Sequence, residues 1–211
     1  MKRCVIVGGA GIENYKLIRE KLRSDDFVIY CDSGLKHMEG LGAAPGLALG
    51  DFDSHERPAF DVETIVLPRE KDDTDTLFAV KEAVRRGFDE FLLVGVIGAR
   101  LDHTLANVYI LEYLDRLGKK AEIVDDYSDI EMVSEEPVSV GEEYEFFSLL
   151  NVTGLAEGVD ISGAKYELKD AIIDCGFQYA VSNEVVPGKT AAVSVKRGKL
   201  LLIKDRRKAA E

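Results

Sequence analysis

Short apolar runs alternate with longer amphipathic stretches through the first 125 residues. The short runs are nearly continuous in apolarity and rich in β-branched and aromatic residues, which is typical of parallel strands covered on both faces. They predict strands at Cys4–Gly8, Phe27–Cys31, Leu47–Leu49, Thr64–Leu67, Phe91–Ile97 and Ala121–Val124. The longer stretches predict helices at Glu13–Arg23, Ser33–Leu41, Thr74–Arg86 and Asp102–Leu117. This alternation predicts an α/β fold with a doubly wound, mainly parallel sheet.

The pattern changes after Asp125, where short strand-like runs are separated by regularly spaced turn residues. The runs are Glu131–Val133, Tyr144–Leu149, Val159–Ser162, Ala171–Cys175, Ala191–Val195 and Leu200–Ile203. Strands at such spacing predict a small antiparallel sandwich or barrel. We therefore expect two domains, residues 1–125 and 129–211, with the linker within Asp125–Ser128.

The composition, 46% hydrophobic and 31% charged, suits a soluble globular protein with a sizeable core. A net charge of −12 argues against nucleic acid as the main partner, since duplex binding needs a basic stripe. The three cysteines show no C-x-x-C spacing, and no segment approaches the roughly 18 apolar residues of a membrane span. These features predict a reduced, cytoplasmic protein.

Two clusters of acidic residues follow successive predicted strands. Gly50-Asp51-Phe52-Asp53-Ser54 follows the third strand, and Lys71-Asp72-Asp73-Thr74-Asp75 follows the fourth. Like charges held close together repel and raise one another's pKa, so the fold needs a compensating cation. Mg²⁺ takes oxygen ligands, often one or two carboxylates together with nucleotide phosphates. The clusters therefore favour a magnesium–nucleotide site, although single acids in such loops also serve as helix caps.

Two further polar loops fall at predicted strand ends, Asp32-Ser33-Gly34 and the segment from Gly98 to His103. In an open α/β sheet, ligands bind beyond the carboxyl ends of the strands. Together with the acidic clusters, these loops would supply carboxylates and two cationic groups, Lys71 and Arg100. This is the set of groups that phosphoryl transfer requires.

Two glycine motifs are incomplete. Gly8-Gly9-Ala10-Gly11 resembles part of a dinucleotide fingerprint, but Asn14 stands where the last glycine is needed. It predicts a tight strand-to-helix turn, with phosphate binding as the alternative. Pro187-Gly188-Lys189-Thr190 resembles the end of a Walker A loop without its first glycine, and predicts a hairpin turn. His103, at a predicted helix start, is the strongest candidate among the three histidines.

Taken in order, these motifs resemble the bacterial thiamine pyrophosphokinase (thiamine diphosphokinase) family. The resemblance rests on the two acidic clusters and on Arg100-Leu101-Asp102-His103-Thr104-Leu105-Ala106-Asn107. It continues in the second half of the chain with Phe147-Ser148-Leu149, Gly163-Ala164-Lys165-Tyr166-Glu167-Leu168 and Ser182-Asn183-Glu184. It therefore covers nearly the whole chain.

The resemblance implies transfer of a diphosphoryl group from ATP to the hydroxyl of thiamine, with AMP released. It implies an α/β domain, a β-sandwich that binds thiamine and dimerises, and a homodimer with active sites at the subunit interface. The implied catalytic residues are Asp53, Asp75 and Arg100, and the implied Mg²⁺ ligands are Asp51, Asp53 and Asp75. The resemblance implies that Arg100, Asp102 and His103 bind ATP and that Ser182 and Asn183 bind thiamine, and the strand-end loops add Asp32, Lys71 and Asp72 as predicted ATP-binding residues.

Two positions depart from the family pattern, because Ser33 and Ala99 stand where the family usually has glycine. Each adds a Cβ where a nucleotide would approach the backbone. Three alternative functions stay open: a diphosphokinase for another hydroxymethyl heterocycle such as a pterin, a metal-dependent glycosyltransferase, and a non-catalytic nucleotide or thiamine sensor. The aromatic residue that stacks on the acceptor is also open, with Tyr166, Phe177 and Tyr179 as candidates.

Overall fold

The structure is a computed structural model that describes the chain except for residues 53–56, 69, 71, 99 and 207–211. The chain divides into two compact units, Met1–Asp126 and Tyr127–Glu211. The first is a parallel sheet with helices on both faces, and the second is built from antiparallel strands. The α/β fold class predicted from the sequence is confirmed.

The sheet of the first unit has the strand order β4-β3-β2-β1-β5-β6, and each neighbouring pair is parallel. Its strands are β1 (Arg3–Val7), β2 (Phe27–Cys31), β3 (Leu47–Gly50), β4 (Thr64–Val66), β5 (Glu90–Val94) and β6 (Lys120–Val124). The chain runs outward from β1 to β4 on one side and then continues at β5 on the other. The strand order therefore reverses between β1 and β5, and in such sheets the crevice beyond the strands at this point is the usual ligand site.

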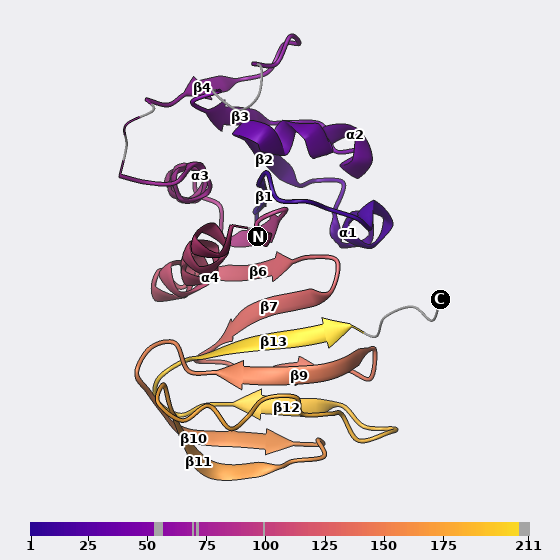
Figure 1. Ribbon diagram of the computed structural model, residues 1–211, viewed down its shortest axis with the longest axis vertical. Coiled ribbons are helices and arrows are strands. Elements are labelled where there is room, and N and C mark those ends of the chain that lie inside the picture. The colour runs from indigo at the N-terminus through magenta and orange to yellow at the C-terminus, as the bar shows by residue number, and fades with distance from the viewer. Residues whose placement is uncertain (53–56, 69, 71, 99, 207–211) are drawn as a thin grey trace. The chain divides into compact units, whose positions relative to one another are not determined.

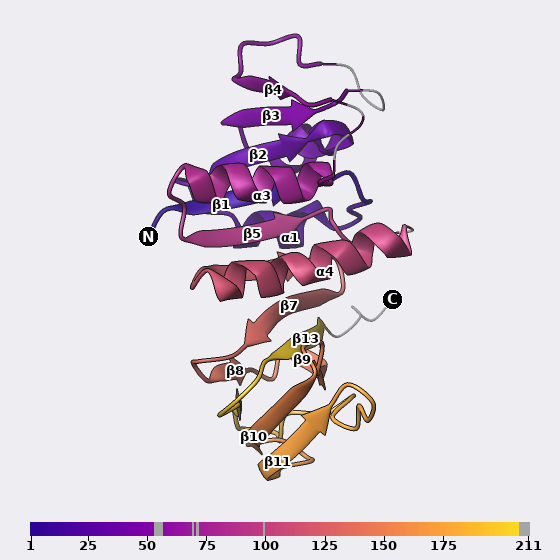
Figure 2. The same cartoon turned by 90° about the vertical axis from the view of Figure 1, so that its left-hand side faces the viewer.

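Helices cover both faces of this sheet, as Figures 1 and 2 show. On one face lie α1 (Tyr15–Lys21), the 3₁₀ helix η1 (Asp32–His37) and α2 (Met38–Leu41). On the other lie α3 (Asp75–Arg85) and α4 (Leu101–Arg116), which stand in front of the sheet in Figure 2. Ile18, Leu35 and Leu41 pack against alternate residues of the inner strands, such as Val5 and Val7, which explains why these strands are apolar throughout.

The helix predicted over Ser33–Leu41 is instead a 3₁₀ helix followed by one short α-helical turn. Two glycines account for the irregularity, because each lies where another group leaves no room for a side chain. A Cβ at Gly34 would lie 2.3 Å from the carbonyl oxygen of Val7, and one at Gly40 would lie 2.4 Å from the ring of Tyr15. Close packing onto β1 and α1 therefore decides the local backbone, and glycine also lowers helix propensity.

We expect Gly34→Ala to destabilise the protein by about 3 kcal/mol, at the upper end of typical overpacking costs. The added methyl group meets main-chain atoms at the end of β1, which cannot rotate away as a side chain can. Gly11→Ala is the matched control, since nothing lies within 4 Å of its added Cβ. Chemical denaturation measures both variants, and equal stabilities would contradict the close approach of η1 to β1.

The second unit consists of two antiparallel sheets, with the strand orders β7-β13-β9 and β11-β10-β12-β8. The strands are β7 (Ser128–Val133), β8 (Val138–Val140), β9 (Tyr144–Leu150), β10 (Leu155–Ser162), β11 (Leu168–Asp174), β12 (Ala191–Ser194) and β13 (Leu200–Arg206). Both sheets contribute to one core, in which Phe147 and Leu202 of the first meet Val159 and Val193 of the second. This is the arrangement of a β-sandwich.

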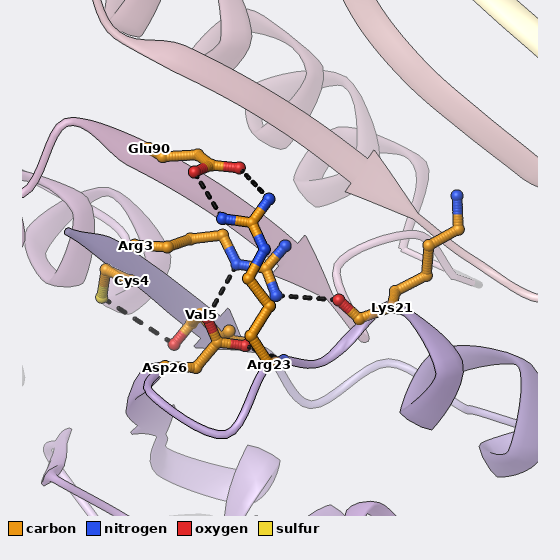
Figure 3. A network of polar contacts seen from close by, with 7 residues as sticks. All are labelled: Arg3, Cys4, Val5, Lys21, Arg23, Asp26 and Glu90. Atoms are coloured by element: carbon orange, nitrogen blue, oxygen red, sulfur yellow. Dashed lines mark hydrogen bonds and ion pairs between the residues drawn. The ribbon is translucent and has the colours of Figure 1, made fainter. Parts of the chain in front are cut away.

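A polar network lies at the amino ends of the strands in the first unit, away from their carboxyl ends (Figure 3). Arg3 of β1 donates from Nε and Nη2 to the two carboxylate oxygens of Asp26, both at 2.7 Å, and its Nη2 also donates to the carbonyl of Lys21 at 2.8 Å. Arg23 makes two hydrogen bonds of 2.6 Å to Glu90 at the start of β5. The network joins the end of α1 to two central strands.

Of the helices described, none is both long and apolar enough to cross a membrane.

Candidate active site

A cleft of about 540 Å³ lies in the first unit beyond the carboxyl ends of β1, β2, β3 and β5. It is therefore at the point where the strand order reverses. Its lining combines glycine backbone, carboxylates and hydroxyl groups with Arg100 and His103. Among the residues predicted for the site, those that the structure brings together here are Asp32, Asp51, Asp75, Arg100 and His103.

The acidic wall of the cleft comes from three different segments of the chain. Asp32 begins η1 after β2, Asp51 follows β3, and Asp75 is the first residue of α3. Thr74, the residue before Asp75, caps that helix by accepting a hydrogen bond of 3.2 Å from the backbone N–H of Leu77. The cap fixes the point at which α3 begins, so it places Asp75 in the cleft.

The backbone carries strain beside these carboxylates. Asp32 and Phe52 have φ values of 42° and 54°, a left-handed conformation that residues other than glycine rarely adopt. Gly50 allows the end of β3 to approach Asp32, since a Cβ at that glycine would lie 2.8 Å from the Cβ of Asp32. Such strain concentrates at functional sites, where the surrounding structure holds it in place.

The donor set of this wall suits a hard divalent cation. Among the residues that the structure describes, no three His, Cys, Asp or Glu side chains form a group that could hold a metal ion by themselves. Mg²⁺ does not need such a group, because it retains water molecules and binds through one or two carboxylates together with substrate phosphates. Asp51 and Asp75 meet this requirement, whereas Asp53, the third predicted ligand, is outside the described residues.

Arg100 stands at the start of α4 and forms an ion pair with Asp102. Its Nε and Nη2 donate to the two carboxylate oxygens at 3.0 and 2.7 Å. This contact lowers the pKa of Asp102 and raises that of Arg100, so both groups stay charged. Of the two, Arg100 lines the cleft and Asp102 contacts it through this arginine, so the predicted role of Asp102 in ATP binding stays a prediction.

The loop after β5 is held by two residues of α4 that also line the cleft. The Thr104 hydroxyl accepts from the N–H of Gly98 at 3.1 Å, and Asn107 donates from Nδ2 to the carbonyl of Val96 at 2.8 Å. Asn107 is buried, so this bond replaces its contact with water. Sequence reasoning assigned neither residue a role, although both stand in the motif from Arg100 to Asn107.

The Gly8–Gly11 segment connects β1 to α1, as predicted, and also forms one wall of the cleft. Gly8 donates to the carbonyl of Val94 at 2.9 Å, and Ala10 donates to the carbonyl of Gly95 at 2.8 Å. A Cβ on Gly8 would lie 2.6 Å from the carbonyl oxygen of Gly95. Glycine is therefore required where the ends of β1 and β5 approach each other, and the incomplete fingerprint gave no sign of this geometry.

Two further residues that line the cleft are Cys31 and Ser33, and Ser33 is one of the two departures from the family pattern. Burial and the nearby charge of Asp75 raise the pKa of the Cys31 thiol well above its ordinary value, which favours the protonated thiol. The Ser33 side chain lies against Gly9. If Gly9 carried a Cβ, that atom would lie 2.0 Å from Ser33 Oγ. The serine hydroxyl thus fills space beside a second glycine. Ala99, the other departure, is outside the described residues.

The predicted thiamine-binding residues lie in the second unit, beside a cavity of about 230 Å³. The cavity is lined by Ile161, Tyr166, Leu168, Tyr179, Ala180, Val181 and Asn183. Asn183 uses its amide within the protein, since Oδ1 accepts from the N–H of Tyr166 at 3.0 Å and Nδ2 donates to its carbonyl at 2.8 Å. Ser182 has a φ of 58°, and its N–H donates to Ser148 Oγ at 3.0 Å.

The remaining predicted residues divide into two groups. Lys71 is outside the described residues, as Asp53 is. Asp72 is described but does not line the cleft. The predicted roles of Lys71 and Asp72 in ATP binding, and of Asp53 in catalysis and metal binding, therefore stay predictions.

Two family models match the chain. Residues 18–124 match "Thiamin pyrophosphokinase, catalytic domain", and residues 134–200 match "Thiamin pyrophosphokinase, vitamin B1 binding domain". Thiamine pyrophosphokinase of Bacillus subtilis (strain 168) is 27% identical over 182 residues, which covers 82% of this chain and 85% of the relative. The two matches follow the order of the two units.

Solved structures support the same grouping. A thiamin pyrophosphokinase from Geobacillus thermodenitrificans superposes with a TM-score of 0.82 at 27% identity, covering 99% of this chain and all (100%) of the other. The yeast enzyme, at 12% identity, shares the fold with a TM-score of 0.75 and coverage of 98% and 86%. Because the catalytic-domain model alone spans residues 18–124, about half of the chain, this protein belongs to the thiamine pyrophosphokinase family.

Proposed function

We propose that this chain transfers the diphosphoryl group of ATP to the hydroxyl of thiamine, giving thiamine diphosphate and AMP. Its family consists of ATP-dependent diphosphotransferases, and the assignment does not favour the alternatives drawn from the sequence. The observation that carries the proposal is the cleft between β1 and β5, in which carboxylates, glycine backbone and Arg100 meet within the segment matched by the catalytic-domain model.

In this reaction the oxygen of the thiamine hydroxyl attacks the β-phosphorus of ATP, and the bond from that phosphorus to the α-phosphate oxygen breaks. Asp51 and Asp75, with Asp53, would hold Mg²⁺, which when bound neutralises charge on the phosphate oxygens. Arg100 stabilises the negative charge that grows on the leaving AMP. Asp75 orients the hydroxyl or accepts its proton. Most of the catalysis then comes from positioning and from fixed charges.

For the acceptor we propose the cavity of the second unit, within the segment matched by the vitamin B1 binding model. Its aromatic lining, Tyr166 and Tyr179, suits the cationic ring of thiamine, because a cation is attracted to the face of an aromatic ring. Phe177 does not line the cavity, but its ring packs on Tyr179 with the centroids 5.3 Å apart. Asn183 contributes by holding the backbone of Tyr166, and Ser182 lies beside it.

The test is to incubate the purified protein with ATP, Mg²⁺ and thiamine and to resolve the nucleotide products. AMP formed in equal amount to thiamine diphosphate supports the proposal. ADP as the product would mean single phosphoryl transfer. AMP with a hydroxymethylpterin but not with thiamine would move the function to another acceptor, and binding without any AMP would indicate a sensor.

We also propose a cytoplasmic location, which the cysteine usage favours, and a homodimer with active sites at the subunit interface, which the family resemblance favours. The division of labour between residues 1–125, for nucleotide and metal, and 129–211, for thiamine, is supported by the order of the two family matches. Analytical ultracentrifugation of the purified chain tests the dimer.

A further inference from the structure

The Gly8–Gly11 segment, which forms one wall of the cleft, is bound through its carbonyl groups by two consecutive residues of η1. Lys36 donates from Nζ to the carbonyl of Gly9 at 2.5 Å, and the Nε2 of His37 lies 2.7 Å from the carbonyl oxygen of Ala10. Gly9 and Ala10 both line the cleft, as does Ser33 earlier in η1. The 3₁₀ helix therefore connects two walls of the nucleotide site.

The partners of His37 determine which ring nitrogen carries the proton. A carbonyl oxygen only accepts hydrogen bonds, so Nε2 must donate to Ala10. Burial lowers the pKa of His37, which keeps the ring neutral near pH 7. In the neutral ring Nδ1 is then an acceptor, and it receives the hydroxyl of Tyr15 at 2.7 Å. A protonated Nε2 aimed at Ala10 is thus built into the fold.

Tyr15 is itself fixed in place. It is the first residue of α1, and its ring lies where a Cβ on Gly40 would be 2.4 Å away. The ring also packs on His37, with the two centroids 5.8 Å apart. The imidazole is consequently oriented by a side chain that cannot easily move, while only 2% of His37 is exposed.

We propose that His37 is a positioning residue for nucleotide binding, because it fixes the orientation of the Ala10–Gly11 peptide. A trans peptide directs its N–H opposite to its carbonyl. Because the Ala10 carbonyl is directed at His37, the N–H of Gly11 is directed away from the imidazole, and we infer that it is available to a phosphate in the cleft that Gly11 lines. Backbone N–H groups placed in this way bind phosphate oxygens. The inference rests on the nucleotide site of the proposed function.

Three substitutions separate the two contacts of His37. His37→Gln keeps an N–H donor at about the reach of Nε2, whereas the amide of His37→Asn reaches only the position of Nδ1, and His37→Ala removes both contacts. We measure the dissociation constant of Mg²⁺–ATP by calorimetry without thiamine, and then the KM of each substrate and kcat. Asp26→Asn, at the opposite end of the strands, is the control for a general loss of stability.

We expect the Ala and Asn variants to bind Mg²⁺–ATP about five- to tenfold more weakly, the range of one lost hydrogen bond. The Gln variant should stay within about twofold of the wild type, and all three should keep the KM for thiamine. Rescue by Asn rather than Gln, unchanged ATP binding in all three, or an equal rise in both KM values would overturn the inference. If the Ala variant does not fold, the comparison of the Gln and Asn variants still tests the inference. A wild-type protein that binds no ATP would instead refute the proposed function.

Discussion

Asp75→Asn is expected to lower kcat by about a hundredfold to a thousandfold, the usual cost of removing a group that stabilises or orients the reacting atoms. The carboxylate lies in the cleft at the start of α3, where it can orient the attacking hydroxyl and bind the metal. Asparagine has the same shape but carries no charge and accepts no proton. The free energy of unfolding should fall by less than about 1 kcal/mol, the value of an acidic residue at a helix N-terminus. AMP formation and thermal unfolding measure the two effects.

The matched control is Asp73→Asn, two residues earlier. Asp73 accepts two hydrogen bonds from Lys81, at 2.8 and 2.7 Å, and does not line the cleft. Its substitution removes the same charge from the same loop, so activity should stay within about twofold of the wild type. Equal losses in the two variants would show that the general negative charge of the loop matters. Near wild-type turnover in Asp75→Asn would remove that residue from the mechanism.

Much of the fold could be predicted because its strands are buried on both faces. The prediction Phe27–Cys31 matches β2, since a continuous apolar run of this length is typical of a parallel strand covered on both faces. The sequence-based predictions of strands are wrong where the local pattern of residues does not determine the backbone conformation. The predicted strand Phe91–Ile97 ends early, at Val94, because Gly95 turns with a φ of 61°. The short β8, Val138–Val140, was not predicted, since three residues show little periodicity.

In the candidate site too, some residues could be predicted from the sequence and others could not. The acidic residues could be predicted, because carboxylates at strand ends carry their own chemical meaning, and the structure places Asp32, Asp51 and Asp75 around one cleft. The groups that hold the cleft in shape were not predicted. His37 was passed over in favour of His103, and its contact with Ala10 joins residues 27 positions apart. Such a contact follows from tertiary packing and has no local signature.

The ion pair between Arg3 and Asp26 lies beside a second, more exposed pair, which makes a direct comparison possible. The side chains of Arg3 and Asp26 are 10% and 3% exposed, whereas those of Arg23 and Glu90 are 49% and 22% exposed. Removing one partner of a buried pair leaves a charge without compensation in a medium of low dielectric constant. An exposed pair is screened by water and contributes about 1 kcal/mol or less.

Asp26→Asn is therefore expected to destabilise the protein by about 3 kcal/mol, the lower limit for breaking a buried ion pair. The substitution would leave the guanidinium of Arg3 buried beside a neutral amide, and the hydrogen bond of 2.7 Å from the N–H of Arg23 would lose its charged acceptor. Glu90→Gln, which breaks the exposed pair, should cost less than about 1 kcal/mol. Denaturation in urea at neutral pH compares the two, and a cost for Asp26→Asn no larger than that for Glu90→Gln would contradict the assignment. In conditions where both variants are folded, kcat should match the wild type, because the network lies at the amino ends of β1 and β5 while the cleft opens at their carboxyl ends.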